Sequence, residues 1–334
     1  MPRIHNNLAD CVVYLYPTES DAADHEQLGG TGFLVHLKVS DDGSDDSVLF
    51  AVTNKHVIQK APVVRVNARA DDVPIAVAPY ELKHWIEHPD GDDLAIVPIV
   101  LDHSRHKFTS IPRRMLLSKK VVQEFDYGIG DDAFIVGRFI NHEGKIRNTP
   151  SLRFGNIAQM PDTILQSWNG FEQESFLIEA KSISGYSGSP VFVHMLPLSA
   201  RPKQDNQTIP LIVPFPGNGP WLLGIDWGHI RNWENVTDIS GKPISPPQYV
   251  PSNTGMMGVV PAWKLDEMFE TERVKEIMKK ARDIQEKVKR NSAGVADVAG
   301  EKRPKKPSGT PADANPNHRE DFDRLLEKAV TPKK

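Results

Sequence analysis

Short apolar runs separated by glycine, proline and polar residues recur along most of the chain. Runs of this length between turn residues are typical of β-strands, and no helical pattern separates them. They fall into two sets, at 8–16, 33–37, 48–53, 63–66, 75–77 and 95–100, and at 133–139, 151–159, 175–180, 190–194, 221–227 and 256–260. The pattern predicts an all-β protein of two six-stranded antiparallel barrels, spanning about 8–104 and about 125–268. Residues 105–125 are mixed and basic and connect them.

Polar segments between the strands are predicted to be loops. Residues 17–29 form one such segment, 195–220 are rich in proline, and 229–254 are rich in Asn, Ser and Pro. Long loops on a rigid scaffold are often functional. The acidic stretch 41–46 contains four Asp residues. Its spacing is not that of an EF-hand and no Glu closes it, so it predicts a solvated turn.

The last quarter of the chain changes character. Apolar residues recur at helical spacing within 264–290, which predicts an amphipathic helix over 269–290 after a barrel domain that ends near 268. Residues 291–317 show no periodicity and are predicted to be a disordered linker. An apolar stripe returns in 318–334. A helix this short needs a surface to pack on, so this segment is predicted to dock on the protein's own barrels or on a partner protein.

Candidate chemistry centres on Ser187, which lies between two glycines in the hexad 185–190, GYSGSP. Glycine permits backbone torsions that other residues avoid, and it lets backbone N–H groups approach a substrate closely. The N–H groups of Gly185 and Ser187 are therefore predicted to form an oxyanion hole. A Ser hydroxyl is a weak nucleophile alone, so a base and a group that orients the base are required.

Two earlier stretches supply these groups. His56 stands just after the apolar run 48–53, and Asp93 leads into the run 95–100. Asp92 is the alternative acid, but the apolar residues directly after Asp93 favour Asp93. The order His56, Asp93, Ser187 fits one of the known triad arrangements. It differs from the order Ser, acid, His of α/β-hydrolases.

Several motifs in this order resemble the trypsin-like serine peptidases of the chymotrypsin fold, above all the bacterial heat-shock proteases, with no PDZ domain evident. The matching segments are 30–35 (GTGFLV), 53–57 (TNKHV), 93–97 (DLAIV), 130–137 (GDDAFIVG), 185–190, 223–228 (LGIDWG) and 258–261 (GVVP). The resemblance covers about residues 8–268. It implies a serine endopeptidase whose active site lies between the two barrels and which takes a protein or peptide substrate.

The resemblance also implies a substrate-binding set of Lys181, Ser182, Asp226, Trp227 and Gly228. The strand at 226–228 would pair with the substrate backbone. Lys181, six residues before the nucleophile, would lie at the base of the specificity pocket and favour an acidic side chain at P1. The alternative is that Lys181 points to solvent and a small or apolar P1 residue is preferred. Two departures stand out: Ser189 replaces the usual glycine, and Asp226 stands where the family often has Ser.

Metal and cofactor chemistry are not predicted. His84 and His88 have the i, i+4 spacing of a helical zinc motif, but Pro89 and the strand-rich context argue against a helix, and the zincin Glu is missing. Cys11 is the single cysteine, so no disulfide can form within the chain. Without a basic stretch and apolar core at the N-terminus, or a run of ~18 apolar residues, the sequence predicts a cytoplasmic protein that does not span a membrane.

Charge is unevenly distributed along the chain. Residues 271–334 hold 17 basic and 11 acidic residues, a net charge of +6. Because the whole chain has a net charge of −4, residues 1–270 have a net charge of −10. A basic tail on an acidic body could contact nucleic acid or an acidic partner, but a merely solvated tail is favoured over both. Two functions from different classes remain: an active serine endopeptidase, and a latent or non-catalytic peptide-binding module on the same fold.

Overall fold

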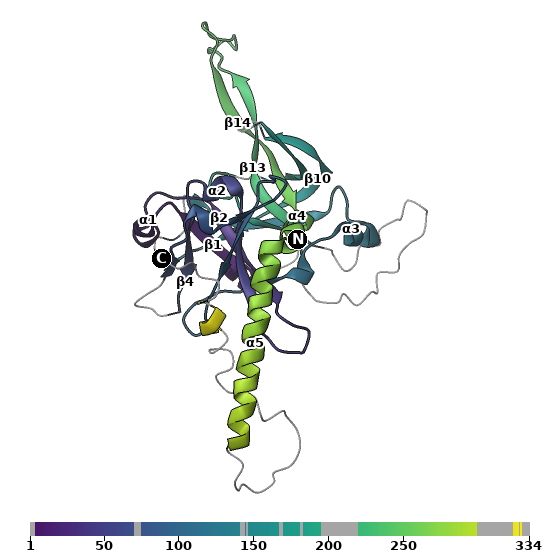
Figure 1. The fold of residues 1–334 in the computed structure, drawn as a ribbon. Helices are drawn as coiled ribbons and strands as arrows, with labels where there is room; N and C mark the ends of the chain where they lie inside the picture. Colours follow the sequence, from purple (N-terminus) through teal and green to yellow (C-terminus); the bar gives the residue numbers. More distant parts are fainter. Residues whose placement is uncertain are drawn as a thin grey trace.

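Two β-sheets, two C-terminal helices and several short helices make up the computed structural model (Figure 1). It describes residues 4–69, 75–140, 144, 146–166, 170–180, 183–194, 220–298, 323–326 and 328. The first sheet contains β1 (Val12–Tyr16), β2 (Thr31–Lys38), β3 (Ser47–Thr53), β4 (Val63–Asn67), β5 (Ile75–Ala78), β6 (Ile86–Glu87), β7 (Ala95–Ile99) and β8 (Ile111–Pro112). The second contains β9 (Asp132–Gly137), β10 (Ser151–Gln166), β11 (Phe171–Glu179), β12 (Pro190–Val193), β13 (Trp221–Asn235) and β14 (Tyr249–Pro261).

The second sheet is a closed barrel of six strands in the order β10-β11-β14-β13-β12-β9, as the strand pattern predicts. The first sheet differs from the predicted six-stranded barrel. It is an eight-stranded half-barrel in the order β5-β4-β1-β2-β3-β7-β6, with the short β8 paired in parallel to β2. The end strands β5 and β6 do not pair with each other, and the segment between them contains a 3₁₀ turn, η2 (Leu82–His84).

One core runs through both sheets. A single cluster of buried side chains includes Phe33 and Phe50 of the first sheet and Phe134 and Trp227 of the second. β1, β7 and β12 are buried at every position, which explains why they read as continuous apolar runs rather than as alternating ones. The two sheets are therefore packed against each other, and residues at their junction are held from both sides.

Short helices occupy two segments that the sequence predicts to be irregular. α1 (Glu19–Asp24) lies in the predicted loop 17–29. Thr18 Oγ1 caps it by accepting the N–H of Asp21 at 3.1 Å, and His25 ends it in the left-handed region at φ 62°. α3 (Lys119–Phe125) lies in the connector, where Ser118 is the cap. A Ser or Thr cap before a short polar stretch is a weaker signal than periodicity, so both helices were missed.

The C-terminal helical region begins earlier and ends later than predicted. α4 (Ala262–Phe269) and α5 (Glu272–Val298) are separated near Glu270, and α5 continues into the predicted linker 291–317. α5 also changes the picture of the acidic stretch 41–46. Asp41, Asp42 and Asp45 are exposed, as the predicted solvated turn requires. Asp46 at its end is buried and accepts a hydrogen bond from Gln285 at 2.8 Å, so the turn also contacts α5.

Residues 229–254 form a β-hairpin rather than a loop. β13 and β14 pair from Gly228–Gly258 out to Asn235–Tyr249 with one register shift between His229 and Arg231, and this arm projects from the body (Figure 1). The other predicted long loop, 195–220, lies outside the described residues except for residue 220. Of the predicted linker, 299–317 lies outside them too. In the predicted docking segment 318–334, the described residues 323–326 are helical and Leu326 is buried in the core cluster.

No helix among the described residues has the length and apolarity to cross a membrane.

Candidate active site

Pairing of β3 with β7 brings His56 and Asp93 together. Thr53 lies opposite Ala95, so the residues after β3 lie beside the residues before β7. His56 is in the first turn of α2 (Lys55–Ile58). Its Nδ1 lies 2.7 Å from Asp93 Oδ2, and its backbone N–H donates to Asp93 Oδ1 at 2.9 Å. Asp93 is 4% exposed, so its carboxylate is inside the protein, and both of its oxygens contact His56.

The neighbouring carboxylate points elsewhere. Asp92 Oδ2 lies 3.2 Å from Lys264 Nζ and 3.4 Å from His88 Nδ1. Asp92 therefore belongs to an ion network between the β6–β7 turn and α4, while Asp93 faces His56.

The turn that carries Ser187 is shaped by two glycines. Gly185 and Gly188 have φ of +97° and +87°, in the region that favours glycine. A Cβ on Gly188 would lie 1.9 Å from the carbonyl oxygen of Thr31, so the backbone there has no room for a side chain. Thr31 ties this turn to the first sheet: its N–H donates to Ser187 O at 2.8 Å, and its Oγ1 donates to Gly185 O at 2.6 Å.

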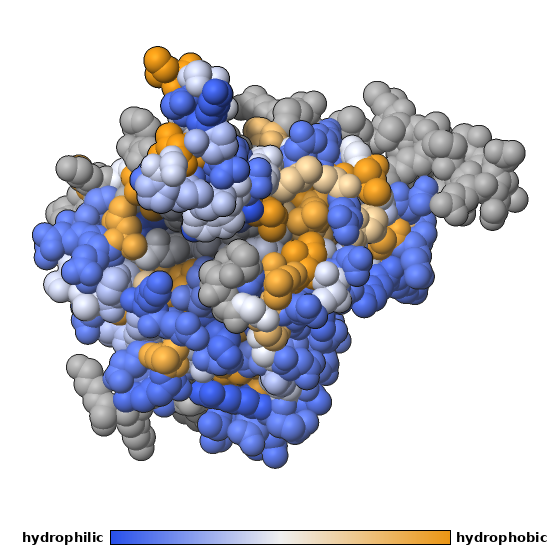
Figure 2. All heavy atoms as spheres, turned by 90° about the horizontal axis from the view of Figure 1, so that it is seen from above, coloured by the Kyte–Doolittle hydropathy of each residue, from blue (hydrophilic) through white to orange (hydrophobic). Residues whose placement is uncertain are grey.

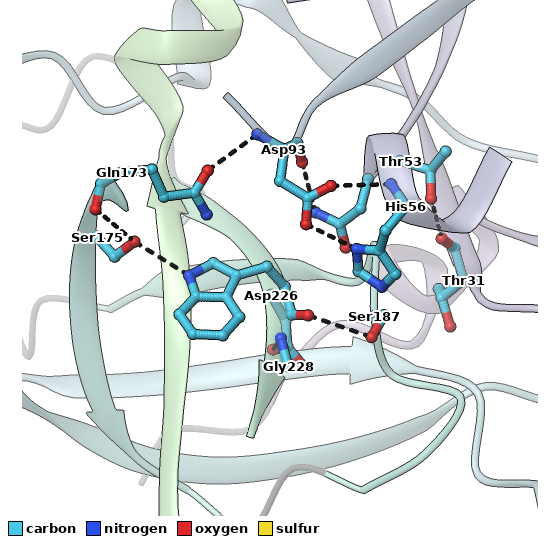
Figure 3. A network of polar contacts seen from close by, with 11 residues as sticks. Thr31, Thr53, His56, Asp93, Gln173, Ser175, Ser187, Asp226 and Gly228 are labelled. Carbon is cyan, nitrogen blue, oxygen red and sulfur yellow. Dashed lines mark hydrogen bonds and ion pairs between the residues drawn. The ribbon is translucent and has the colours of Figure 1, made fainter. Parts of the chain in front are cut away.

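The Ser187 side chain and the His56 imidazole point toward one another across the junction of the two sheets (Figure 3). His56 comes from the first sheet and Ser187 from the turn before β12 of the second. The Ser187 hydroxyl donates to the Trp227 carbonyl oxygen at 3.4 Å, a long hydrogen bond that a substrate or a closer acceptor can replace. The His56 side chain is 30% exposed, so the site is open to solvent on one side.

The predicted oxyanion hole has donors available. Within the part of the chain that the structure describes, the N–H groups of Gly185 and Ser187 donate to no protein acceptor, whereas those of Tyr186, Gly188 and Ser189 all do. Two unpaired donors on either side of a tight turn are what an oxyanion requires.

A network from the second barrel supports Asp93 from behind, and the sequence did not reveal it. Gln173 of β11 accepts the Asp93 N–H through Oε1 at 2.9 Å, and Ser175 accepts the Trp227 indole N–H at 3.0 Å (Figure 3). On the first sheet, Asn54 Nδ2 donates to the Asp93 carbonyl oxygen at 2.9 Å. Asn54 and Gln173 are both buried. Asp93 is thus held through its backbone by both sheets.

The predicted substrate-binding residues fall into two groups. Lys181 and Ser182 lie outside the described residues. Asp226, Trp227 and Gly228 lie on β13 beside Ser187. The Asp226 carboxylate accepts the Gly228 N–H at 2.8 Å and is buried, so it is turned along its own strand while Asp93 serves His56.

The histidines considered for a zinc motif do not share a helix. His84 ends η2, and His88 follows β6. His88 does lie near Asp90 and Glu267, with ligand atoms within 4.8 Å of one another. However, the Lys264 ammonium lies 3.5 Å from Glu267 Oε2 and neutralises this group, so the arrangement is an ion network with a cation already supplied by the chain.

Comparison with known protein families identifies the domain that carries these residues. Residues 30–195 match the family of trypsin-like peptidase domains. The chain contains a trypsin-like peptidase domain. No curated protein matches the sequence.

Similar solved structures include the apo form of the MamO protease domain from Magnetospirillum magneticum, which is 13% identical and covers 80% of this chain and 100% of that chain at a TM-score of 0.45. The Rv3671c protease of M. tuberculosis, in an inactive form, is 17% identical over 80% of this chain and 94% of that chain at 0.40. The HtrA-type protease AlgW with a decapeptide is 15% identical and covers 72% of this chain and 51% of that chain at a TM-score of 0.37.

Proposed function

We propose that this protein is a serine endopeptidase in which Ser187 is the nucleophile, His56 the general base and Asp93 the group that orients the base. The observation that carries the proposal is the pairing of His56 Nδ1 with Asp93 Oδ2 at 2.7 Å, with the imidazole turned toward Ser187 (Figure 3). The His56 backbone N–H donates to the other oxygen of the same carboxylate at 2.9 Å, which holds the carboxylate in place beside the ring. A neutral imidazole with Nδ1–H bonded to Asp93 presents Nε2 as the acceptor for the Ser187 proton.

The reaction then proceeds in two halves. The Ser187 oxygen attacks the carbonyl carbon of the scissile bond while His56 accepts the hydroxyl proton, and the Asp93 carboxylate stabilises the imidazolium. The C–N bond breaks as His56 returns that proton to the leaving amine, which leaves an acyl-enzyme. Water then repeats the same steps and releases the acid. The N–H groups of Gly185 and Ser187 stabilise the oxyanion in both halves.

For the substrate, we propose a protein or peptide bound in an extended form beside β13. From the sequence position of Lys181 we also propose an acidic residue at P1, because an ammonium at the base of the specificity pocket would favour an anionic partner. A positional peptide library tests it, and no gain for Asp or Glu at P1 would remove the idea.

A fluorophosphonate probe tests the activity directly. It should label wild-type protein, and Ser187→Ala should lose both the label and hydrolysis of casein while keeping the melting temperature. Ser189→Ala is the matched control, because Ser189 is two residues away and its Oγ has no partner among the described residues. His56→Ala should be as inactive as Ser187→Ala, and the double variant little worse, since these groups act as a unit.

The second candidate, a peptide-binding module, is favoured by one observation: the hydrogen bond of the Ser187 hydroxyl goes to Trp227 O at 3.4 Å. In that case Ser187 stays unlabelled, yet peptides still bind beside β13. Full casein turnover by Ser187→Ala would contradict the triad.

A further inference from the structure

The arm formed by the outer parts of β13 and β14 has two edges of different character. Its register is continuous from Arg231–Asn253 to Asn235–Tyr249, with Trp233 opposite Pro251. In an antiparallel pair, residues alternate between those that bond to the partner strand and those whose backbone groups face away. Pro251 has no N–H to donate, so the Trp233–Pro251 pair is of the non-bonded kind.

Alternation then fixes the rest of the arm. The backbone N–H and C=O groups of Arg231, Trp233 and Asn235 face away from β14. The bond from Val236 N–H to Gln248 O at 2.9 Å falls on the alternate set, as this assignment requires. Along the arm, β13 pairs with no other strand in the described part of the chain, because β12 pairs with it only at Trp221–Ile225. The outer edge of β13 therefore presents a row of intact backbone donors and acceptors.

The outer edge of β14 is different. Its outward-facing residues are Tyr249, Pro251 and Asn253, and the proline removes the central donor. Proline is a common way to block strand addition on an exposed edge. One edge of the arm is thus blocked and the other is open.

The open edge starts at the proposed nucleophile. The Trp227 carbonyl accepts the hydrogen bond from Ser187 Oγ, and the strand continues from there to Asn235, with one register shift between His229 and Arg231. At about 3.3 Å per residue, this edge runs about 26 Å outward from the active site. In Figure 1 the same stretch projects clear of the body, and Figure 2, which looks at the molecule from above, shows hydrophobic residues among the hydrophilic ones on this face.

Side chains on the arm add specificity to the backbone. Trp233 is 62% exposed and Tyr249 is 57% exposed. Both belong to non-bonded pairs two residues apart, so they share one face of the hairpin. A strand added beside Trp233 would place its own side chain on this face, within reach of the indole ring.

We infer that the outer edge of β13 is an extended subsite that binds the substrate as an added β-strand, with an apolar residue opposite Trp233. Antiparallel addition is the more stable mode, and it places the N-terminal side of the substrate along the arm. Trp233 is six residues beyond Trp227, so the apolar residue lies about six positions before the scissile bond. The inference rests on the proposed function and names the substrate class of the same site: long, extended polypeptides rather than short peptides.

Peptide binding to the Ser187→Ala protein tests this without any need for turnover. Two fluorescein-labelled peptides share the same residues around a Glu–Ala bond. The longer one adds alternating Val and Thr on the N-terminal side, with Phe opposite Trp233. Fluorescence anisotropy should give at least tenfold tighter binding for the longer peptide.

Three variants locate the effect. Trp233→Pro removes the outward N–H and the ring without breaking a bond to β14, and it should reduce the affinity of the longer peptide to that of the shorter one. Trp233→Ala should lose only part of the gain. Tyr249→Ala, on the same face but the blocked edge, should stay within about twofold of the parent, and all variants should keep the parent's circular dichroism and its affinity for the shorter peptide.

Equal affinity for the two peptides, or a gain that survives Trp233→Pro, overturns the inference. A second outcome also overturns it: Trp233→Pro changes the protein from dimer to monomer in light scattering and leaves the peptide affinity unchanged. That result would assign the edge to a second copy of the chain. Failure of the fluorophosphonate probe to label Ser187, with the affinity pattern intact, contradicts the proposed catalysis and leaves the subsite standing.

Discussion

Replacing Gln173 by Met tests whether the second barrel positions the acid of the first sheet. The side chain keeps its length but loses the oxygen that accepts the Asp93 N–H at 2.9 Å. That N–H is buried, and a buried donor left without a partner costs about 1–3 kcal/mol. If the whole cost falls on the active geometry of Asp93, kcat/KM falls by about 5- to 150-fold, since 1.4 kcal/mol is a factor of ten.

The assay compares kcat and KM for one peptide substrate with the melting temperature of the same preparations. Gln173→Met should lower kcat with little change in KM, because Gln173 acts through Asp93. Gln173→Glu keeps an acceptor oxygen but adds a charge near Asp93, so it should restore part of kcat and move the acid limb of the pH profile. Gln166→Met, equally buried at the end of β10, is the control and should affect stability only. Wild-type kcat and melting temperature in Gln173→Met would refute the reasoning.

Three further predictions follow from single residues. Gly188→Ala should cost about 2–5 kcal/mol of stability from strain and overlap, whereas Gly130→Ala, which has a φ of +93° but open space, should show the strain alone in denaturant unfolding. Burial raises the pKa of the Cys11 thiol, and Ellman's reagent should react with this buried thiol only when the protein is unfolded. Above the ordinary thiol pKa of 9.0 the folded state keeps a proton that the unfolded chain releases, so the free energy of unfolding should fall as the pH rises. Leu326→Ala should lower the free energy of unfolding by about 2–5 kcal/mol, because Leu326 is buried against the core. Lys328→Ala is the control, since Lys328 is exposed and its loss should leave unfolding unchanged. An unchanged free energy of unfolding in Leu326→Ala would contradict packing of the C-terminal segment on this chain.

The strands that build the core were predictable because burial leaves a clear mark on sequence. β2, β3 and β7 are apolar runs with turn residues at their ends, and the registers between them bring the segments after Thr53 and before Ala95 together. The chemistry of the site was visible for the same reason: Ser, His and Asp each follow or precede such a run. The positions of Lys181 and Ser182 stay predictions.

The arm escaped prediction because it has no buried face. Most of its residues from Arg231 to Pro251 are exposed, so selection for burial leaves no alternation to detect, and Asn, Ser and Pro there suggest a loop. The end strand β5 was predicted at 75–77, but β6 and β8 were missed because each is only two residues long and cannot be distinguished from a connection. Pairing between exposed strands is a tertiary property that local patterns do not encode.

Gln173 was missed for a different reason, and that reason bears on how the site works. A glutamine in an alternating strand carries no chemical signal of its own, and its role exists only because two sheets distant in sequence are packed together. Asp93 belongs to the first sheet, yet its N–H is bonded to β11 of the second, while the Ser187 turn of the second is bonded to Thr31 of the first. Each half of the candidate triad is thus held in place by the opposite sheet. Any movement that separates the sheets must break both bonds at once, so the geometry of His56, Asp93 and Ser187 should be lost before either sheet unfolds.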